Sequence, residues 1–235
     1  MNERLRCLVA EAWLFRTRVE REAAHRFGRL AAAIDAFDPE SPVPSLLRRA
    51  AGDEVRHAGF CAELSAAYGR PAPQDDGLSP DIAPARLAPR EAVLYEMVAA
   101  CCITETESVA TVTTLMAEGA EPRVREILHE IARDEVVHSR MGWAHLAREA
   151  ASIDVSFLSP WIPPMLSGTV SDELFAAGEE EAEAAELLRH GVFPRARKRE
   201  IFVGALREII LPGLEQFGVD AAPARAWLAA RADLS

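Results

Sequence analysis

The chain has 235 residues, a formal net charge of −11, and a composition that is 49% hydrophobic and 27% charged, which is typical of a soluble globular protein. The acidic balance argues against nucleic acids and anionic membranes as partners, since both need a basic surface. Neither a run of about 18 apolar residues nor the apolar core of a signal peptide is present, so we expect a cytoplasmic protein without a membrane span.

The pattern is helical along the whole chain, since Ala, Leu, Glu and Arg dominate and strand-like alternation is scarce. Short turns join the first predicted helix to the second and the third to the fourth, and a long connection with five prolines joins the two hairpins. This connectivity predicts an all-α four-helix bundle with one long crossover. The four helices are expected over residues 3–35, 44–69, 90–118 and 122–152.

The pattern is looser from residue 153 onward. Trp161-Ile-Pro-Pro is interpreted as a break, and further helices are expected over 171–190, 194–218 and 222–232. The acidic run 179–186 and the basic run 195–199 are interpreted as solvated faces. We expect residues 1–152 to form the bundle and residues 153–235 to form a helical extension that packs on it within the same domain.

The four cysteines do not form a Cys-x-x-Cys motif. This excludes a zinc ribbon and a rubredoxin-type iron site. Buried thiols in a reducing compartment are therefore expected for Cys7, Cys61, Cys101 and Cys102.

One motif, Asp-Glu-Val-x-His, occurs twice, at residues 53–57 and 134–138. Composition predicts roughly 0.03 occurrences of Asp-Glu-x-x-His per chain, so two are not expected by chance. Residues three apart lie on one face of a helix, so the Glu and His of each motif can reach the same point.

Both motifs lie on the inward faces of their helices. Glu135 and His138 fall in the apolar stripe of the fourth helix, and Glu54 and His57 fall in that of the second. A buried carboxylate is too costly to keep without a cation, so we expect a metal here.

The other helix of each hairpin carries a Glu-x-Glu, of which one glutamate faces inward. Glu20 lies in the apolar stripe of the first helix and Glu105 in that of the third, whereas Glu22 and Glu107 point outward. The two halves of the bundle are thus an internal duplication.

Six inward ligands result, with four carboxylates and two imidazoles. This donor set suits two divalent ions of iron or manganese better than zinc. We expect two irons, with a mixed iron–manganese or a manganese pair as the alternative. The six ligands are Glu20, Glu54, His57, Glu105, Glu135 and His138.

On this doubled motif, the sequence from residue 9 to about 148 resembles the ferritin-like di-iron carboxylate superfamily, which includes bacterioferritin, rubrerythrin, the ribonucleotide reductase small subunit and di-iron oxygenases. The resemblance implies a ferritin-like bundle. In it, Glu54 and Glu135 would bridge or chelate the irons, and Glu20 and Glu105 would be terminal ligands. His57 and His138 would each hold one iron.

The resemblance also assigns roles to the two motif aspartates. In related sites, this Asp accepts a hydrogen bond from the histidine of the opposite helix and so fixes its tautomer. Asp53 would hold His138, and Asp134 would hold His57.

Other candidate residues are given lesser roles. His145 is interpreted as a core histidine, and Arg16 and Cys101 are placed near the metal cavity. No tyrosyl radical site is predicted, because both tyrosines lie about ten residues along their helices from the ligands. The residues assigned to the surface or to no role are His25, His129, Tyr68 and Tyr95.

The favoured function is O2 activation for the oxidation or oxygenation of a small organic substrate by a monomer or homodimer, with an external electron donor. The doubled motif is also similar to that of the p-aminobenzoate N-oxygenase group. However, the extra histidine ligand of that group is Ile131 here, so arylamine N-oxygenation is not supported. The alternatives are a ferroxidase or iron-storage ferritin, and a non-enzymatic module that the metal stabilises. Neither the substrate nor a catalytic residue beyond the ligands can be identified.

Overall fold

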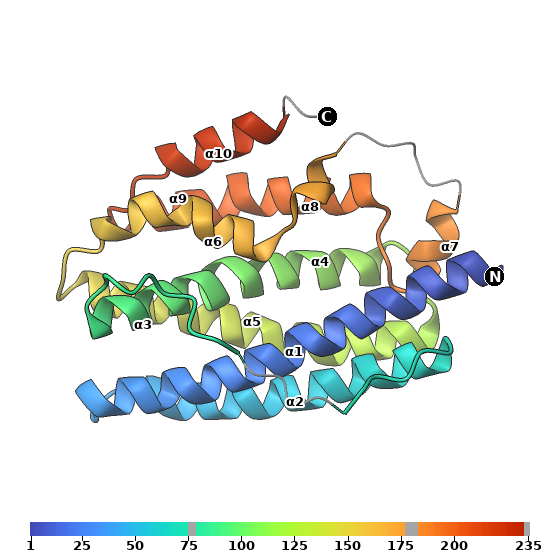
Figure 1. The fold of residues 1–235 in the computed structure, drawn as a ribbon, viewed down its shortest axis with the longest axis horizontal. Helices are drawn as coiled ribbons and strands as arrows, with labels where there is room; N and C mark the ends of the chain where they lie inside the picture. Colours follow the sequence, from blue (N-terminus) through green and yellow to red (C-terminus); the bar gives the residue numbers. More distant parts are fainter. Residues whose placement is uncertain (75–78, 177–182, 233–235) are drawn as a thin grey trace. The chain divides into compact units, whose positions relative to one another are not determined.

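The computed structural model describes residues 1–74, 79–176 and 183–232, and all regular structure in these ranges is helical (Figure 1). The longest helices are α1 (Glu3–Phe37), α2 (Val43–Ala67) and α5 (Pro122–Ala150). The predicted third helix is divided into α3 (Pro89–Met97), the π-helical segment η1 (Val98–Thr104) and α4 (Glu105–Ala117). The elements after α5 are η2 (Ser156–Trp161), α6 (Ile162–Thr169), η3 (Asp172–Phe175), α7 (Ala184–Arg189), α8 (Arg195–Ala205), η4 (Leu206–Ile210), α9 (Leu211–Glu215) and α10 (Ala222–Ala232).

The chain divides into two compact units by its internal contacts. Unit 1 comprises residues 1–93, 112–134 and 182–193, and unit 2 comprises residues 94–111, 135–181 and 194–235. The division does not follow chain order, because α4 and α5 each contribute to both units. The expectation that residues 1–152 form the bundle and residues 153–235 form an extension therefore stays a prediction.

Unit 1 is built on the antiparallel hairpin of α1 and α2, which lie side by side (Figure 1). The side chain of Asn2 caps α1 by accepting the N–H of Leu5 at 2.8 Å, and the Ser65 hydroxyl on α2 donates to the Ala10 carbonyl on α1 at 3.0 Å. The core between the helices is apolar and fully buried, with Val9, Trp13, Phe27, Leu30, Ile34, Leu47 and Cys61 among its members.

The described part of the long connection between α2 and α3 is irregular, as predicted. Two arginines of α1 hold it: Arg21 donates to the Pro73 carbonyl at 2.7 Å, and Arg29 pairs with Asp81 at 2.7 Å. These contacts satisfy polar groups of a segment whose five prolines prevent a helix.

Unit 2 contains the second part of α3, η1, the first part of α4, the second part of α5 and the later elements except α7, which belongs to unit 1. An aromatic cluster of edge-to-face rings joins η3, α8 and α10 through Phe175, Phe202 and Trp227. Gly213 in α9 lies against the indole of Trp143 on α5, where an added Cβ would come within 2.8 Å of the ring. The close approach of these helices therefore requires glycine at this position.

One expectation for the C-terminal region is wrong. The described residues between 171 and 190 do not form one helix: η3 ends at Phe175, the following Ala176 is extended (ψ 142°), and α7 begins at Ala184. The helix expected over 194–218 is confirmed from Arg195 to Glu215, where the π-helical segment η4 lies between α8 and α9.

The prolines after Trp161 begin a helix as well as ending one. Pro163 and Pro164 occupy the first positions of α6, where an N–H has no intrahelical partner. The predicted break is therefore the junction of η2 and α6.

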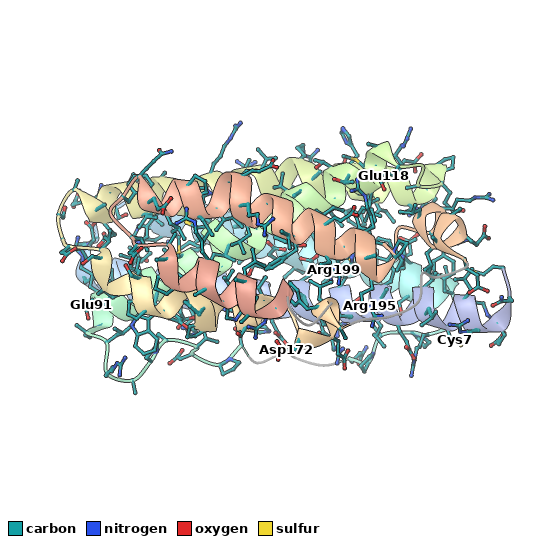
Figure 2. All side chains as sticks on the ribbon, turned by 90° about the horizontal axis from the view of Figure 1, so that it is seen from above. Cys7, Glu91, Glu118, Asp172, Arg195 and Arg199 are labelled. Carbon is teal, nitrogen blue, oxygen red and sulfur yellow. The ribbon has the colours of Figure 1, made fainter. Side chains whose placement is uncertain are left out.

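The expectation for the charged runs is met only in part. Glu179–Ala182 lie outside the described residues, while Glu183 accepts from Asn2 at 2.6 Å and Glu186 lies within 4.0 Å of the N-terminal amine. The basic run lies at the start of α8, where Arg195 and Arg199 are half-exposed (Figure 2).

The prediction of four buried thiols is correct for Cys61, Cys101 and Cys102 but wrong for Cys7 (Figure 2). Cys7 is exposed because it lies on the polar face of α1, where its nearest polar neighbour is Glu3. None of the described helices combines the length and the apolarity required to cross a membrane.

Candidate metal-binding site

Unit 1 holds three of the predicted ligands together: Glu20 on α1, and Glu54 and His57 on α2. One ligand atom from each lies within 4.8 Å of the others. The contact between Ser65 and Ala10 explains why, since antiparallel helices in that register bring Glu20 level with Glu54. Glu54 and His57 are fully buried, and Glu20 is half-buried.

Unit 2 holds the other three: Glu105 at the start of α4, and Glu135 and His138 on α5. Their ligand atoms also lie within 4.8 Å of one another, and all three side chains are buried. A hydrogen bond of 2.8 Å between the hydroxyls of Thr106 and Ser139 fixes the register of α4 against α5 at the residues that directly follow Glu105 and His138.

We call these sets the unit 1 triad (Glu20, Glu54, His57) and the unit 2 triad (Glu105, Glu135, His138). Within each, the imidazole Nδ1 faces the carboxylate of its own helix, at 3.2 Å in the unit 1 triad and 3.5 Å in the unit 2 triad. Each triad offers two carboxylates and one imidazole, which fits iron or manganese. A divalent ion would also neutralise carboxylates that are costly to bury.

The opposite ring nitrogen of His57 faces Asp134. His57 Nε2 lies 3.2 Å from Asp134 Oδ2, so the carboxylate can hold the tautomer that presents Nδ1 to the unit 1 triad. Burial alone would raise the pKa of Asp134, but hydrogen bonds from Arg133, His57 and Arg56 outweigh it and lower that pKa. Asp134 is therefore an ionised acceptor.

Sequence reasoning missed Arg56, the variable residue of the first motif. Its guanidinium donates to Asp53 at 2.9 Å and to Asp134 at 2.6 Å, and so links the two motif aspartates. A cation three residues after Asp53 on the same helix face was the available signal. The pairing of Asp53 with His138 stays a prediction.

The helix that carries Glu105 is not the continuous α-helix that the pattern predicted. Immediately before Glu105, η1 inserts π-type hydrogen bonds, including one from the Glu105 N–H to the Ala100 carbonyl. The wider turn shifts the faces of the helix, so that Val109, which lies one turn after Glu105 and in the same apolar stripe by helical periodicity, is half-buried. On α5, Gly142 lies against Cys101 of η1, where an added Cβ would come within 2.3 Å of the Cys101 Cβ.

His145 is buried, as predicted, and Cys101 lies in the core of unit 2. The placement of Arg16 and Cys101 near the metal cavity stays a prediction. Arg16 stacks on the Trp13 ring at 4.6 Å. Glu107 is half-buried, not fully exposed, because its carboxylate accepts from the Thr111 hydroxyl at 2.7 Å. The residues on exposed surface are Glu22, His25 and His129.

Two further buried carboxylates were not foreseen, Glu96 on α3 and Glu149 on α5. Glu149 follows His145 by one turn and His138 by three, so its phase on α5 was a usable signal. Glu96 lies in an otherwise apolar stretch, and no sequence signal indicated that it would be buried.

No family model matches the chain, and no curated protein matches it. Among solved structures, the chain is similar to protein 19 with aldehyde deformylating oxidase activity from Synechococcus. The two share 20% sequence identity over 94% of this chain and 96% of that chain, with a TM-score of 0.60. This likeness concerns the fold, and it confirms the all-helical, ferritin-like architecture that the doubled motif predicted. Because both chains are covered almost throughout, the shared fold includes the C-terminal helices.

Proposed function

We propose that the unit 1 and unit 2 triads together form one dinuclear metal centre, with which the protein activates O2 and oxidises a small organic substrate. The observation that carries the proposal is that the two triads have identical donors, two carboxylates and one imidazole each. The chain itself links them, since Asp134, which contacts His57, is directly followed in α5 by Glu135.

In this proposal, Glu54 and Glu135 would bridge or chelate the two ions, Glu20 and Glu105 would be terminal ligands, and each histidine would hold one ion. Two bound irons, or manganese in their place, would supply the redox chemistry for O2. The protein's own contribution is orientation: Asp134 accepts from His57 Nε2–H and so directs Nδ1 inward, while Arg133 and Arg56 favour the ionised form of Asp134. Asp53 is proposed to do the same for His138.

Aldehydes are the first substrate class to test, because aldehyde deformylating oxidase activity belongs to a protein of the same fold. The reaction also needs electrons beyond those of the substrate, so we propose an external one-electron donor.

Metal analysis of the purified protein, followed by anaerobic Fe(II) loading and rapid mixing with O2, tests the proposal. We expect about two irons per chain and rapid O2 uptake. Glu135→Ala and His57→Ala should each lower the iron content and abolish the uptake. The matched control is Glu22→Ala, which removes an exposed glutamate two residues from Glu20 and should change neither.

Three results would contradict the proposal. A chain that binds no iron, or whose iron content the ligand variants leave unchanged, has no such centre. Bound iron that never reacts with O2 would indicate a structural metal. A many-subunit cage by native mass measurement would indicate iron storage.

A further inference from the structure

Tyr68, at the C-terminal end of α2 in unit 1, has an imidazole and a carboxylate within hydrogen-bond distance of its hydroxyl. The hydroxyl lies 2.8 Å from His190 Nδ1 and 3.3 Å from Glu121 Oε1. His190 Nε2 lies 3.4 Å from Glu186 Oε1, and an Nε2–H that donates to this carboxylate makes Nδ1 the acceptor for Tyr68. The phenol thus has a proton acceptor in place.

The surroundings of this pair favour movement of the proton to His190. Burial, followed by the charges of Glu121 and Glu186, raises the pKa of Tyr68, so the phenol stays protonated at neutral pH. Two carboxylates also flank the ring of His190: Glu121 lies 3.7 Å from its Nδ1 and Glu186 lies 3.4 Å from its Nε2. A phenol that loses an electron becomes a strong acid, and a base at 2.8 Å makes that loss easier.

The distance of Tyr68 from the ligands along α2 argued against a radical site when only the sequence was considered, but the structure places Trp13 of α1 beside the pair. Its Nε1–H donates to the His190 carbonyl at 3.0 Å, and its ring packs against Gly191, where an added Cβ would come within 2.7 Å of it. Gly191 has φ +75°, a left-handed conformation that suits glycine. Trp13 and Glu20 lie two helical turns apart on one face of α1, about 10 Å along the axis.

The two aromatic residues are suited to different tasks. The Trp13 N–H is bound to a carbonyl, which is not a base, and the Arg16 guanidinium lies 4.6 Å from the centre of its ring. A positive charge on the indole is therefore disfavoured. Tyr68 can instead donate its proton to His190, so that the oxidising equivalent is most stable on Tyr68.

We propose that Tyr68 and His190 form a redox-active pair that, through Trp13, removes one oxidising equivalent from the metal centre when no organic substrate consumes it. This rests on the proposed function. Tyr68 gives one electron, by way of Trp13, to the oxidised metal centre, and its hydroxyl proton moves to His190 Nδ1. The products are a neutral tyrosyl radical, an imidazolium and a centre reduced by one electron. The external one-electron donor then reduces Tyr68, and the proton returns from His190.

The chain offers a matched control, since its only other tyrosine is Tyr95. Tyr95, in unit 2, packs edge-to-face against Trp161 with ring centroids 6.1 Å apart. Its hydroxyl has no hydrogen bond to another residue in the described part of the chain. Tyr95 therefore lacks the base that Tyr68 has.

The first experiment mixes iron-loaded wild type, Tyr68→Phe and Tyr95→Phe with O2, without substrate or reductant, and records EPR spectra of freeze-quenched samples. We expect a tyrosyl signal in wild type and Tyr95→Phe and its loss in Tyr68→Phe, with equal iron content and O2 uptake in all three. Trp13→Phe should slow the appearance of the signal several-fold. A signal that survives in Tyr68→Phe, or O2 uptake without any tyrosyl signal in wild type, would overturn the proposal.

A second experiment separates this proposal from the proposed function. Metal-free protein is photo-oxidised by flash excitation of ruthenium tris(bipyridine) with a sacrificial acceptor, in H2O and in D2O. The Tyr68 radical should form with a solvent isotope effect, and His190→Gln, which keeps the main-chain acceptor for Trp13, should lower its yield several-fold. If this holds while loaded protein consumes no O2, the redox pair is supported and the dinuclear oxygenase is not. If His190→Gln left the oxidation of Tyr68 unchanged, the proposed role of His190 as proton acceptor would be contradicted, independently of the metal centre.

Discussion

At the scale of single residues, Arg56 supports the polar groups behind His57. It occupies the variable position of the first motif, where the second motif has Val137, an exposed apolar residue. Its contact to Asp134 joins those from Arg133 and His57 to keep the Asp134 pKa below its ordinary value, against the effect of burial. The orientation of His57 therefore depends on a residue that is not itself a proposed ligand.

We expect Arg56→Gln to lower the free energy of unfolding of the metal-free protein by about 1 kcal/mol at neutral pH, since Arg56 is partly exposed to solvent. The folded pKa of Asp134 lies below its unfolded value of about 3.9. The stabilisation is therefore present above that pH and is lost as the pH falls through the folded pKa. Urea unfolding of variant and wild type over a pH series measures the difference, which should shrink in acid.

The control for this prediction is Arg123→Gln, which removes an exposed pair with Glu63 and should change the unfolding free energy little. A difference between Arg56→Gln and wild type that remained constant into acid would show that Asp134 is not the group that Arg56 stabilises.

At the scale of elements, the π-helical segment η1 and the glycine opposite it set the approach of α5 to the helix that carries Glu105. Gly142 lies against Cys101, in the middle of η1, and the hydroxyl bond between Thr106 and Ser139 follows one turn further on. The absence of a side chain at residue 142 thus allows the register that brings Glu105 to Glu135 and His138.

Gly142→Ala should destabilise the protein by about 1–3 kcal/mol, because the new Cβ would lie 2.3 Å from the Cys101 Cβ. It should also weaken metal binding, since Glu105 would be displaced. Thermal unfolding and iron titration measure the two effects. Gly28→Ala is the control: its Cβ meets nothing within 4 Å, and alanine should stabilise α1 by roughly 0.5–1 kcal/mol. Equal behaviour of the two variants would contradict the packing argument.

At the scale of the whole molecule, an acidic chain buries carboxylates, which is costly without a cation. Its net charge is −11, and three of the proposed ligands, Glu54, Glu105 and Glu135, are buried glutamates. Metal bound at the proposed centre would contribute to folding, and we expect the metal-free protein to be the less stable form.

We expect Glu135→Gln to be more stable than wild type without metal and less stable than wild type with metal. In chelator the variant should unfold at a higher temperature than wild type, because one buried charge is gone. In excess Mn(II) wild type should be the more stable, by roughly 2.7 kcal/mol at a metal concentration one hundred times the Kd. Calorimetry in both conditions measures the crossing. Glu22→Gln should follow wild type, and a variant that kept its advantage in Mn(II) would count against Glu135 as a ligand.

Much of the architecture was predictable because local signals agreed. The prolines at residues 39–44 and 71–89 mark the ends of helices, and the apolar stripes with period 3.6 identify the faces. The stripe of the third helix was only partly correct, because a π-helical turn changes the phase without a sequence signal as clear as proline. The helix expected over 171–190 failed since periodicity does not tell which core each end enters.

The sequence by itself determined the fold class and the six proposed ligands, because helical periodicity places Glu and His three residues apart on one face and the motif occurs twice. Only the tertiary structure brought residues distant in the chain together: Arg56 to Asp134, Gly142 to Cys101, and His190 to Tyr68 and Trp13. These partners are separated by tens to more than a hundred residues. Their contacts depend on the registers and faces of whole helices, which short-range patterns do not encode.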